Sequence, residues 1–376
     1  METIGTAADS SADIKDALCT APSGPTDLFC LSYVQLCGLS YDVDTAGIPA
    51  AVAAPGNVQT WSLQGQWSCV WGPVLDEHEA NLVYVAAYYH VPGAPPTALV
   101  VVVRGTDVTD DVWGDFKEAF EDLAGWGQET PPWLSDPDIL VSEGVLDALT
   151  TVAGLRCEGA TVSEFLAGQL GGDSSANPVL VVTGHSLGAC VTTVLAPWLM
   201  SSLAAAGIRV RMVPATFAAP TAGNQAYADY LARTFLYAPR YYNNLDAVPR
   251  GWAELDSIRT IYDSEGLSTP WVVDGTIDGF VWLMGETGAT YAQPGGDRPL
   301  EGVFCMELDW YSQIGAQHDH NNYILQLKGE LPSCPVSARP RNRRWTPEER
   351  EAALSTQAPA GNDASAAAAA EPPLPE

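Results

Sequence analysis

The segment GHSLG contains a serine with the neighbours that a nucleophilic serine requires. Ser186 stands between Gly184 and Gly188, and glycine at these two positions lets the backbone turn sharply from a strand into a helix without side-chain collisions. Such a turn exposes the serine hydroxyl and directs the amide of the next residue, Leu187, toward the group under attack. The segment therefore predicts acyl transfer, with the Leu187 amide as one donor of an oxyanion hole. The five-residue pattern also occurs by chance, so its meaning depends on partners elsewhere in the chain.

The first partner must be a histidine, because a serine hydroxyl attacks an ester only when a base takes its proton and a carboxylate orients that base. The chain has five histidines. Three of them, His78, His90 and His185, lie before the serine or beside it. In sheet proteins that present a serine on such a turn, the order along the chain is serine, acid, histidine. The base is therefore His318 or His320.

Asp246 is the candidate for the acid. It lies in the sequence YYNNLDAVPR, directly after a predicted strand and just before Val248 and Pro249. This places it on a tight loop at the carboxyl end of a strand, whereas Asp256 and Asp263 have less constrained surroundings. The alternative is an aspartate that only caps its own turn. With Asp246, the order of serine, acid and histidine is satisfied.

The elements that must position these residues are strands and helices in alternation. Residues 179–182 are apolar and mostly β-branched, as in a strand buried on both faces, and residues 189–206 follow as a helix. Strands are also predicted at 67–74, 81–90 and 98–104, with the last two forming a hairpin at a sheet edge. The pattern after the serine predicts an α/β protein with a mostly parallel central sheet and helices on both faces.

Two segments near the predicted site have two interpretations each. Residues 107–126 have apolar side chains at helical spacing between many carboxylates, which predicts an amphipathic helix. It is either a surface helix packed on the core or a mobile lid that covers the serine. Residues 251–300 are rich in glycine and contain three tryptophans without clear periodicity. They are either an insertion that lines a substrate cleft or irregular surface structure.

Three further helical stretches are predicted, at 28–39, 142–170 and 225–233. Residues 189–208 carry no charge, but their threonines, serines and proline favour a buried helix over a membrane span. Pro197 is expected to kink or divide that helix.

The composition limits the partners and the location. The net charge of −29 over 376 residues argues against nucleic acid and anionic membrane surfaces as partners and leaves neutral or zwitterionic substrates open. The eight cysteines form no zinc-binding pattern, so neither a metal nor a cofactor is expected. No positively charged segment precedes an apolar one at the start, which predicts a cytoplasmic location. We expect a disordered segment at 1–25, one domain at 26–335, and a tail with a short helix at 336–376. The oligomeric state is left open.

Several of these segments resemble the class 3 lipases of the α/β-hydrolase fold, which include fungal triacylglycerol lipases. GHSLGA is similar to the nucleophile motif of that family and NNLDAVP to its acid motif, which assigns Asp246. VVVRGT resembles the strand whose last residue contributes to the oxyanion hole, which assigns Thr106. The segment with Trp113 and Phe116 resembles the start of the lid. DHNNY is similar to the histidine motif and favours His320 over His318.

The resemblance implies a serine hydrolase that cleaves carboxylic esters of lipids through Ser186, Asp246 and His320 and an acyl-enzyme. Lipid or ester substrates, met at a lipid–water interface, are the expected partners. Two alternatives stay open: a short-chain carboxylesterase or phospholipase with the same triad, and a lipase-like binding or signalling module without turnover.

Overall fold

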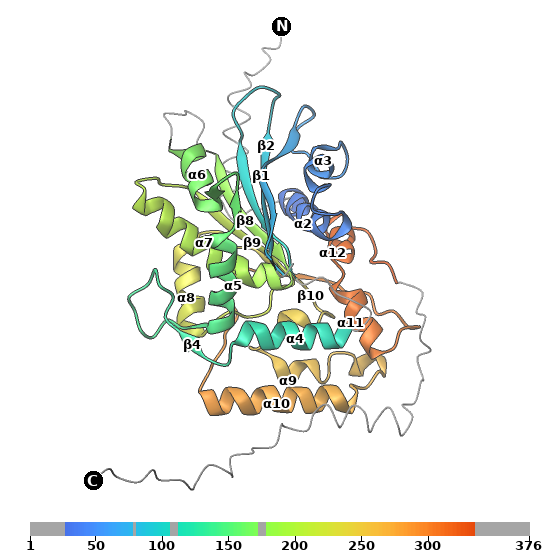
Figure 1. The fold of residues 1–376 in the computed structure, drawn as a ribbon. Coiled ribbons are helices and arrows are strands. Elements are labelled where there is room, and N and C mark those ends of the chain that lie inside the picture. Colours follow the sequence, from blue (N-terminus) through green and yellow to red (C-terminus); the bar gives the residue numbers. More distant parts are fainter. Residues whose placement is uncertain (1–26, 78–79, 106–111, 172–177, 335–376) are drawn as a thin grey trace, which may run out of the picture.

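The computed structural model describes residues 27–77, 80–105, 112–171 and 178–334, which build a seven-stranded sheet flanked by helices (Figure 1). In spatial order its strands are β1 (Gln66–Leu75), β2 (Leu82–Tyr89), β3 (Ala98–Val103), β8 (Val179–His185), β9 (Met212–Phe217), β10 (Arg240–Asn243) and β11 (Asp297–Leu300). The pairs β1–β2 and β2–β3 are antiparallel, and the strands from β3 to β11 are parallel. The predicted α/β class is confirmed. The predicted hairpin is β2–β3, but β1 lies outside it at the sheet edge.

Helices cover both faces of the sheet. On one face lie α2 (Asp27–Asp42), α3 (Ile48–Ala53) and α12 (His320–Leu327), and on the other α5 (Glu143–Gly154), α6 (Val162–Leu170), α7 (Leu187–Ala205) and α8 (Gln225–Thr234). The prediction of one helix over 142–170 was wrong. The short strands β6 (Arg156–Cys157) and β7 (Ala160–Thr161) separate α5 from α6, because Thr161 and Glu164 form a capping box that starts a new helix. Two further short strands, β4 (Gln128–Glu129) and β5 (Val141–Ser142), pair with each other.

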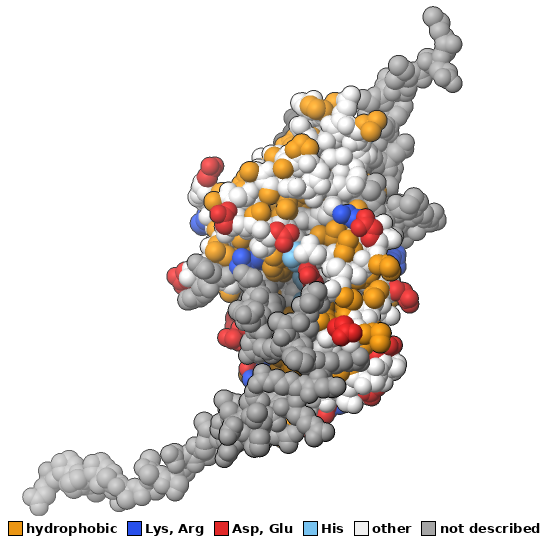
Figure 2. Space-filling model, turned by 90° about the vertical axis from the view of Figure 1, so that its right-hand side faces the viewer, with side chains coloured by type: hydrophobic (Ala, Val, Ile, Leu, Met, Phe, Trp, Pro, Cys, Tyr) orange, Lys and Arg blue, Asp and Glu red, His pale blue; other side chains and the backbone are white. Residues whose placement is uncertain are grey.

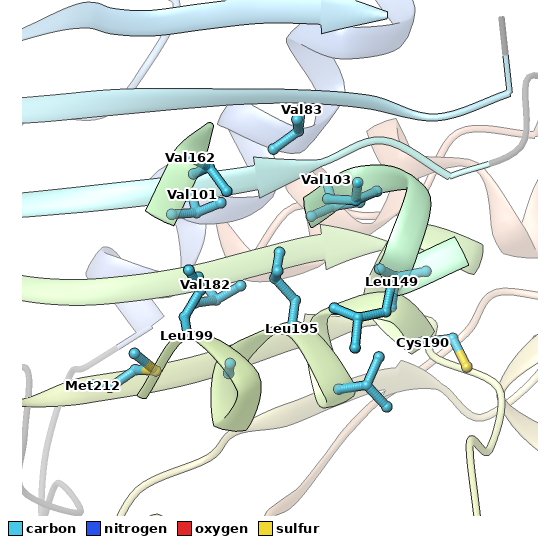
Figure 3. Packing of buried hydrophobic residues seen from close by; sticks show 14 of the residues in the cluster. Val83, Val101, Val103, Leu149, Val162, Val182, Cys190, Leu195, Leu199 and Met212 are labelled. Atoms are coloured by element: carbon cyan, nitrogen blue, oxygen red, sulfur yellow. The ribbon is translucent and has the colours of Figure 1, made fainter. Parts of the chain in front are cut away.

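The helix after the serine, α7, lies in the core. Figure 3 shows Leu195 and Leu199 of this helix beside Val101 and Val182 of the sheet. Among the described residues, α7 has the length and hydropathy of a membrane span, but 67% of its most apolar window is buried inside the protein, as in a core helix. Pro197 does not divide it.

The proline is accommodated because a neighbouring side chain replaces the backbone hydrogen bond that it removes. A proline nitrogen cannot donate to the carbonyl four residues earlier. In α7 that carbonyl belongs to Thr193, and it accepts a hydrogen bond of 2.9 Å from the hydroxyl of Tyr227 in α8. The helix is therefore continuous from Leu187 to Ala205.

A third layer lies beyond the carboxyl ends of the parallel strands (Figure 1). It contains α4 (Val112–Ala124), η1 (Val248–Arg250), α9 (Leu255–Ile258), η2 (Asp263–Glu265), α10 (Trp271–Thr287) and α11 (Trp310–His318). Apolar side chains of all these elements except η2 share one buried cluster. The segment 251–300 thus contains the long helix α10 and the short helices α9 and η2, and it packs on α4. The alternative of irregular surface structure is wrong for residues 271–287. The sequence of this segment shows no clear helical periodicity because α10 has apolar residues on both its buried and its exposed faces.

Two features bear on the environment of the protein. A disulfide bond joins Cys305 and Cys334. Disulfides are uncommon in cytosolic proteins, and the cytoplasmic location stays a prediction.

On the face seen in Figure 2, acidic side chains are spread over the surface with few basic ones between them. The predicted terminal segments, 1–25 and 336–376, lie wholly outside the described residues.

Candidate active site

Ser186 occupies the turn that the sequence predicts, between the end of β8 and the start of α7. Its backbone φ of 59° lies in the left-handed region that residues other than glycine rarely adopt. A Cβ atom at position 184 would overlap the backbone of Gly188, and one at position 188 would overlap the backbone of β3. Only glycine fits at either place, so the chain can pass close to itself and hold the serine at the tip of the turn.

His318 is the histidine beside the serine. Its Nε2 atom lies 2.8 Å from Ser186 Oγ, and its Nδ1 atom lies 2.8 Å from Oδ2 of Asp246. His318 is the last residue of α11, whereas Asp246 lies in the loop after β10. Because Nδ1 faces a carboxylate, that nitrogen carries the proton, and Nε2 is left to accept the proton of the serine hydroxyl. The structure thus joins two of the three predicted residues, Ser186 and Asp246, in one hydrogen-bonded chain.

The choice of His320 over His318 is corrected by this geometry. His320 is the first residue of α12, and its Nε2 atom lies 3.1 Å from Oδ1 of Asp42. Its ring stacks on Tyr41, with 5.1 Å between the ring centroids. Asp319, between the two histidines, has an extended conformation and caps α12. This break between the helices sends the two side chains to different partners.

The carboxylate of Asp246 is fully buried and held by groups on three sides. Its Oδ1 accepts the Val248 amide at 2.9 Å, and its Oδ2 accepts the Tyr323 hydroxyl at 2.7 Å as well as His318. The Tyr323 hydroxyl in turn accepts the Asn243 amide at 3.0 Å. Burial, and then the charge of Asp246, raises the pKa of Tyr323 well above its usual value, so this hydroxyl stays protonated and able to donate.

Tyr323 belongs to the site, although the sequence motifs did not lead us to predict it there. The signal that could have found it is the tyrosine at the end of DHNNY, the motif that misassigned the histidine. In this structure the tyrosine of that motif contacts the acid, while the histidine of the motif lies elsewhere.

Tyr41 of α2 is a second residue that was not predicted, and it bonds to Gly105, the residue before Thr106. Its hydroxyl accepts the Gly105 amide at 2.8 Å and lies 3.4 Å from the carbonyl of His185. A Cβ atom at Gly105 would collide with both of these partners. Thr106 itself lies outside the described residues. Leu187 is the first residue of α7, so its amide has no acceptor one turn earlier in the helix.

His185, the residue before the serine, is buried among aromatic rings. Its ring centroid lies 4.7 Å from that of His318 and 5.5 Å from that of Tyr323. Burial lowers the pKa of His185 well below its usual value of 6.5, and the electrostatic effect of the neighbouring His318 and His320 lowers it further. This histidine is therefore neutral and forms part of the packing beneath the site.

The helix α4 covers the site with its apolar face. Phe116 contacts the His318 ring edge to face, with 4.9 Å between the centroids, and Trp113 contacts Trp310 of α11 at 5.6 Å. Only 5% of Ser186 and 4% of His318 is exposed. Both Trp113 and Phe116, predicted at the start of a lid, thus lie in the cover, and Phe116 lies against the histidine.

We compared the chain with known proteins and with the model of a protein family. The crystal structure of M37 lipase has the same fold, with a TM-score of 0.67 at 23% identity, and the match covers 83% of this chain and 94% of that one. A triacylglycerol lipase from Penicillium expansum is similar with a TM-score of 0.46 at 15% identity, covering 76% and 82% of the two chains. Lipase II from Rhizopus niveus gives 0.42 at 18% identity, covering 61% and 76%. None of the curated proteins matches the sequence significantly. The family model described as "Lipase (class 3)" matches residues 100–254, which include Ser186 and Asp246, so this part of the chain is a class 3 lipase domain, a type of carboxylic ester hydrolase.

Proposed function

We propose that this protein hydrolyses carboxylic esters of lipids, with acylglycerols as the main substrates, through Ser186, His318 and Asp246. The observation that carries the proposal is the continuous chain of hydrogen bonds from Ser186 Oγ through the His318 ring to Asp246, with both links at 2.8 Å. This arrangement has the geometry that nucleophilic attack by a serine on an acyl group requires.

In the first half of the reaction, Ser186 Oγ attacks the ester carbonyl carbon while His318 Nε2 takes the hydroxyl proton. The imidazolium that forms is stabilised by the buried carboxylate of Asp246, which is itself held by Tyr323 and by the Val248 amide. The proton then passes from His318 to the alkoxy oxygen of the substrate. The carbon–oxygen bond breaks, and the alcohol, here a diacylglycerol or glycerol derivative, leaves.

In the second half, water replaces the alcohol. His318 takes a proton from the water, the hydroxide attacks the acyl-enzyme, and the proton returns to Ser186 as the fatty acid leaves. In both halves the negative oxygen of the tetrahedral intermediate needs fixed donors. We assign the Leu187 amide and Thr106 to this role, because Gly105, the residue before Thr106, lies beside Ser186. His318 carries each of these proton transfers, and the amides only donate hydrogen bonds to the oxyanion.

The burial of the site favours a lipid substrate over a small soluble ester. Phe116 lies on the His318 ring, and Ser186 is 5% exposed, so an acyl chain can reach the serine only after α4 moves. Moving α4 exposes the apolar side chains Trp113, Phe116 and Phe120, which is unfavourable in water and favourable at a lipid surface. We infer that α4 is a lid that opens at such a surface.

The first test of the proposal is covalent labelling of the serine. A fluorophosphonate should label the protein, and the Ser186→Ala variant should not be labelled. Labelling that survives in this variant would contradict the assignment of the nucleophile. The absence of hydrolysis of any ester from C2 to C18 by the wild type would instead favour a binding or signalling module.

A comparison of substrates tests the lipid preference. Among p-nitrophenyl esters, emulsified triolein and phosphatidylcholine, we expect triolein to be hydrolysed fastest. We also expect the hydrolysis rate of a partly soluble ester to rise abruptly once its concentration exceeds the solubility limit. A smooth hyperbolic dependence through that limit would favour a carboxylesterase. A higher rate on phosphatidylcholine than on triolein would favour a phospholipase.

A further inference from the structure

The outward side of α10 carries an apolar surface that the reaction at Ser186 does not use. Trp271, Val281 and Trp282 are 42%, 44% and 63% exposed, which is unusual for large apolar side chains on one helix. We call these three residues the outer face of α10. Trp271 and Trp282 are among the three tryptophans in the segment 251–300.

Helical geometry places the two tryptophans on nearly the same line along the helix. They are 11 residues apart, which is close to three full turns and about 16 Å along the axis. The opposite side of the helix is buried and carries Val273, Ile277 and Phe280. The helix is therefore held by one apolar side while the two tryptophans point away from the protein.

The outer face lies at the same end of the molecule as the cover of the active site. Phe280, on the buried side of α10, contacts Trp252 with 5.2 Å between the ring centroids, and Trp252 contacts Phe120 of α4 at 6.1 Å. One turn earlier in α4, Phe116 lies on the His318 ring. In Figure 1, α10 is the outermost helix of this layer, with α4 and α9 between it and the sheet.

Three acidic residues lie on α10, and two of them are paired. Asp278 lies between Trp271 and Trp282 along the same side of the helix, and Glu286 follows Trp282 by one turn. Asp274 and Asp278 both bond to Arg259, at 3.3 Å and 2.6 Å, and Arg259 also bonds to Asp256 of α9 at 3.0 Å. No lysine or arginine lies within Trp271–Thr287. With a net charge of −29 for the whole chain, the outer face would be repelled by an anionic membrane and suits an uncharged or zwitterionic surface.

We propose that the outer face of α10 binds the surface of a neutral or zwitterionic lipid phase and holds the α4 cover against it. Tryptophan side chains favour the boundary between water and lipid, because the ring is apolar and the indole N–H retains a polar partner there. This inference rests on the proposed function, because lipid esters are the substrates that would bring such a surface to the protein. The continuity from α10 through Trp252 to α4 is the observation that favours lipid over a protein partner.

The binding step is tested without turnover. The Ser186→Ala protein is mixed with phosphatidylcholine vesicles, and the bound fraction is measured by co-sedimentation. Adding Trp271→Ala and Trp282→Ala should lower the apparent affinity at least about tenfold, since these side chains supply most of the apolar area that enters the lipid. The matched control is Leu63→Ala, which removes another fully exposed apolar side chain on the loop before β1 and should leave binding unchanged. Equal binding of the double variant and its parent would overturn the inference.

Fluorescence of the otherwise unaltered tryptophans gives a second measurement that does not depend on how the double variant folds. Vesicles of brominated phosphatidylcholine should quench part of the tryptophan emission of the Ser186→Ala protein, and an absence of quenching would overturn the inference. Sedimentation in lipid-free buffer tests the alternative that a second copy of the chain covers the outer face. A dimer that dissociates in the double variant would show that a second copy covers this face, against our inference.

Activity measurements separate this inference from the proposed function. Hydrolysis of a soluble p-nitrophenyl ester by the double variant should equal that of the wild type, while hydrolysis of emulsified triolein should fall at least about tenfold. If the wild type hydrolyses neither substrate, the proposed function fails, and the vesicle experiments still decide the inference. If both rates are unchanged in the double variant, the inference fails and the proposed function stands.

Discussion

The Nε2 atom of His318 lies 2.8 Å from Ser186 Oγ, whereas His320, two residues later, bonds to Asp42. Asp319 between them ends one helix and caps the next. The two histidines therefore differ in what they can do: His318 can move a proton at the serine, and His320 ties α12 to α2.

This difference gives the most direct mutational test of the site. His318→Ala should lower kcat/KM on a soluble ester by at least about 10⁴, because the serine loses its base. His320→Ala removes a contact with Asp42 and Tyr41 and should lower it by no more than about tenfold. Steady-state kinetics of the two purified variants check this prediction. The opposite order of effects would restore His320 as the base.

Ser186 and Asp246 could be predicted because local sequence determines their positions. The glycines at 184 and 188 are required by the close approach of the backbone, and Asp246 occupies a short loop directly after a strand. The histidine could not be chosen in the same way. Whether position 318 or 320 faces the serine depends on where one helix ends, and a shift of a residue or two at a helix end leaves little trace in the sequence.

Neither the contribution of Tyr41 nor the course of α10 could be predicted from the sequence, and the reasons differ. Tyr41 reaches Gly105 only because α2 packs on the sheet, 64 residues away in the sequence, and no short motif records that contact. The segment of α10 is apolar on two sides, so the usual alternation of apolar and polar faces is missing. The central strands, by contrast, could be predicted because burial on both faces makes them almost wholly apolar. β3 ends one residue before its predicted end, and β8 begins at the predicted residue and extends three residues further.

Tyr41→Phe should lower kcat about tenfold while leaving KM nearly unchanged. The variant keeps the ring that stacks on His320 but loses the oxygen that accepts the Gly105 amide. A looser turn before Thr106 weakens donors that act on the transition state, so the loss falls on kcat. Separate kcat and KM values on a soluble ester provide the measurement.

The matched control for Tyr41 is Tyr84→Phe. The Tyr84 hydroxyl also joins α2 to the sheet by donating to the Leu36 carbonyl at 2.6 Å, but its strand, β2, is separated from β8 by β3. This control should lower the free energy of unfolding by about 1–3 kcal/mol without changing kcat. Equal kcat losses in both variants would show that Tyr41 acts only through stability.

Tyr323→Phe should affect both activity and stability. It removes a donor from the Asp246 carboxylate and leaves the buried Asn243 amide without its acceptor. We expect the free energy of unfolding to fall by about 1–3 kcal/mol and kcat to fall about tenfold, because the carboxylate that orients His318 is less firmly held. Urea denaturation and steady-state kinetics measure the two effects.

The control for Tyr323 is Tyr262→Phe, which removes a buried hydroxyl that donates to the Leu245 carbonyl at 2.9 Å. Leu245 is next to Asp246 in the same loop, but this hydroxyl makes no hydrogen bond to the carboxylate. A comparable loss of stability with unchanged kcat is expected. If Tyr262→Phe reduced kcat as much as Tyr323→Phe, Tyr323 would act only by stabilising the loop that carries Asp246.

The buried His185 predicts that acid destabilises the protein. Its pKa is held well below 6.5 in the folded state, first by burial and then by the neighbouring histidines, whereas in the unfolded chain it is near 6.5. Below pH 6.5 the unfolded state therefore binds a proton that the folded state does not, and the free energy of unfolding falls as the pH falls. The contribution of His185 is a loss of about 1.4 kcal/mol between pH 7.5 and pH 5.5. Urea denaturation at these two values, compared between the wild type and His185→Gln, measures it. The variant should lose about 1.4 kcal/mol less than the wild type over this interval, and an equal loss in the two proteins would mean that His185 takes up its proton in the folded state.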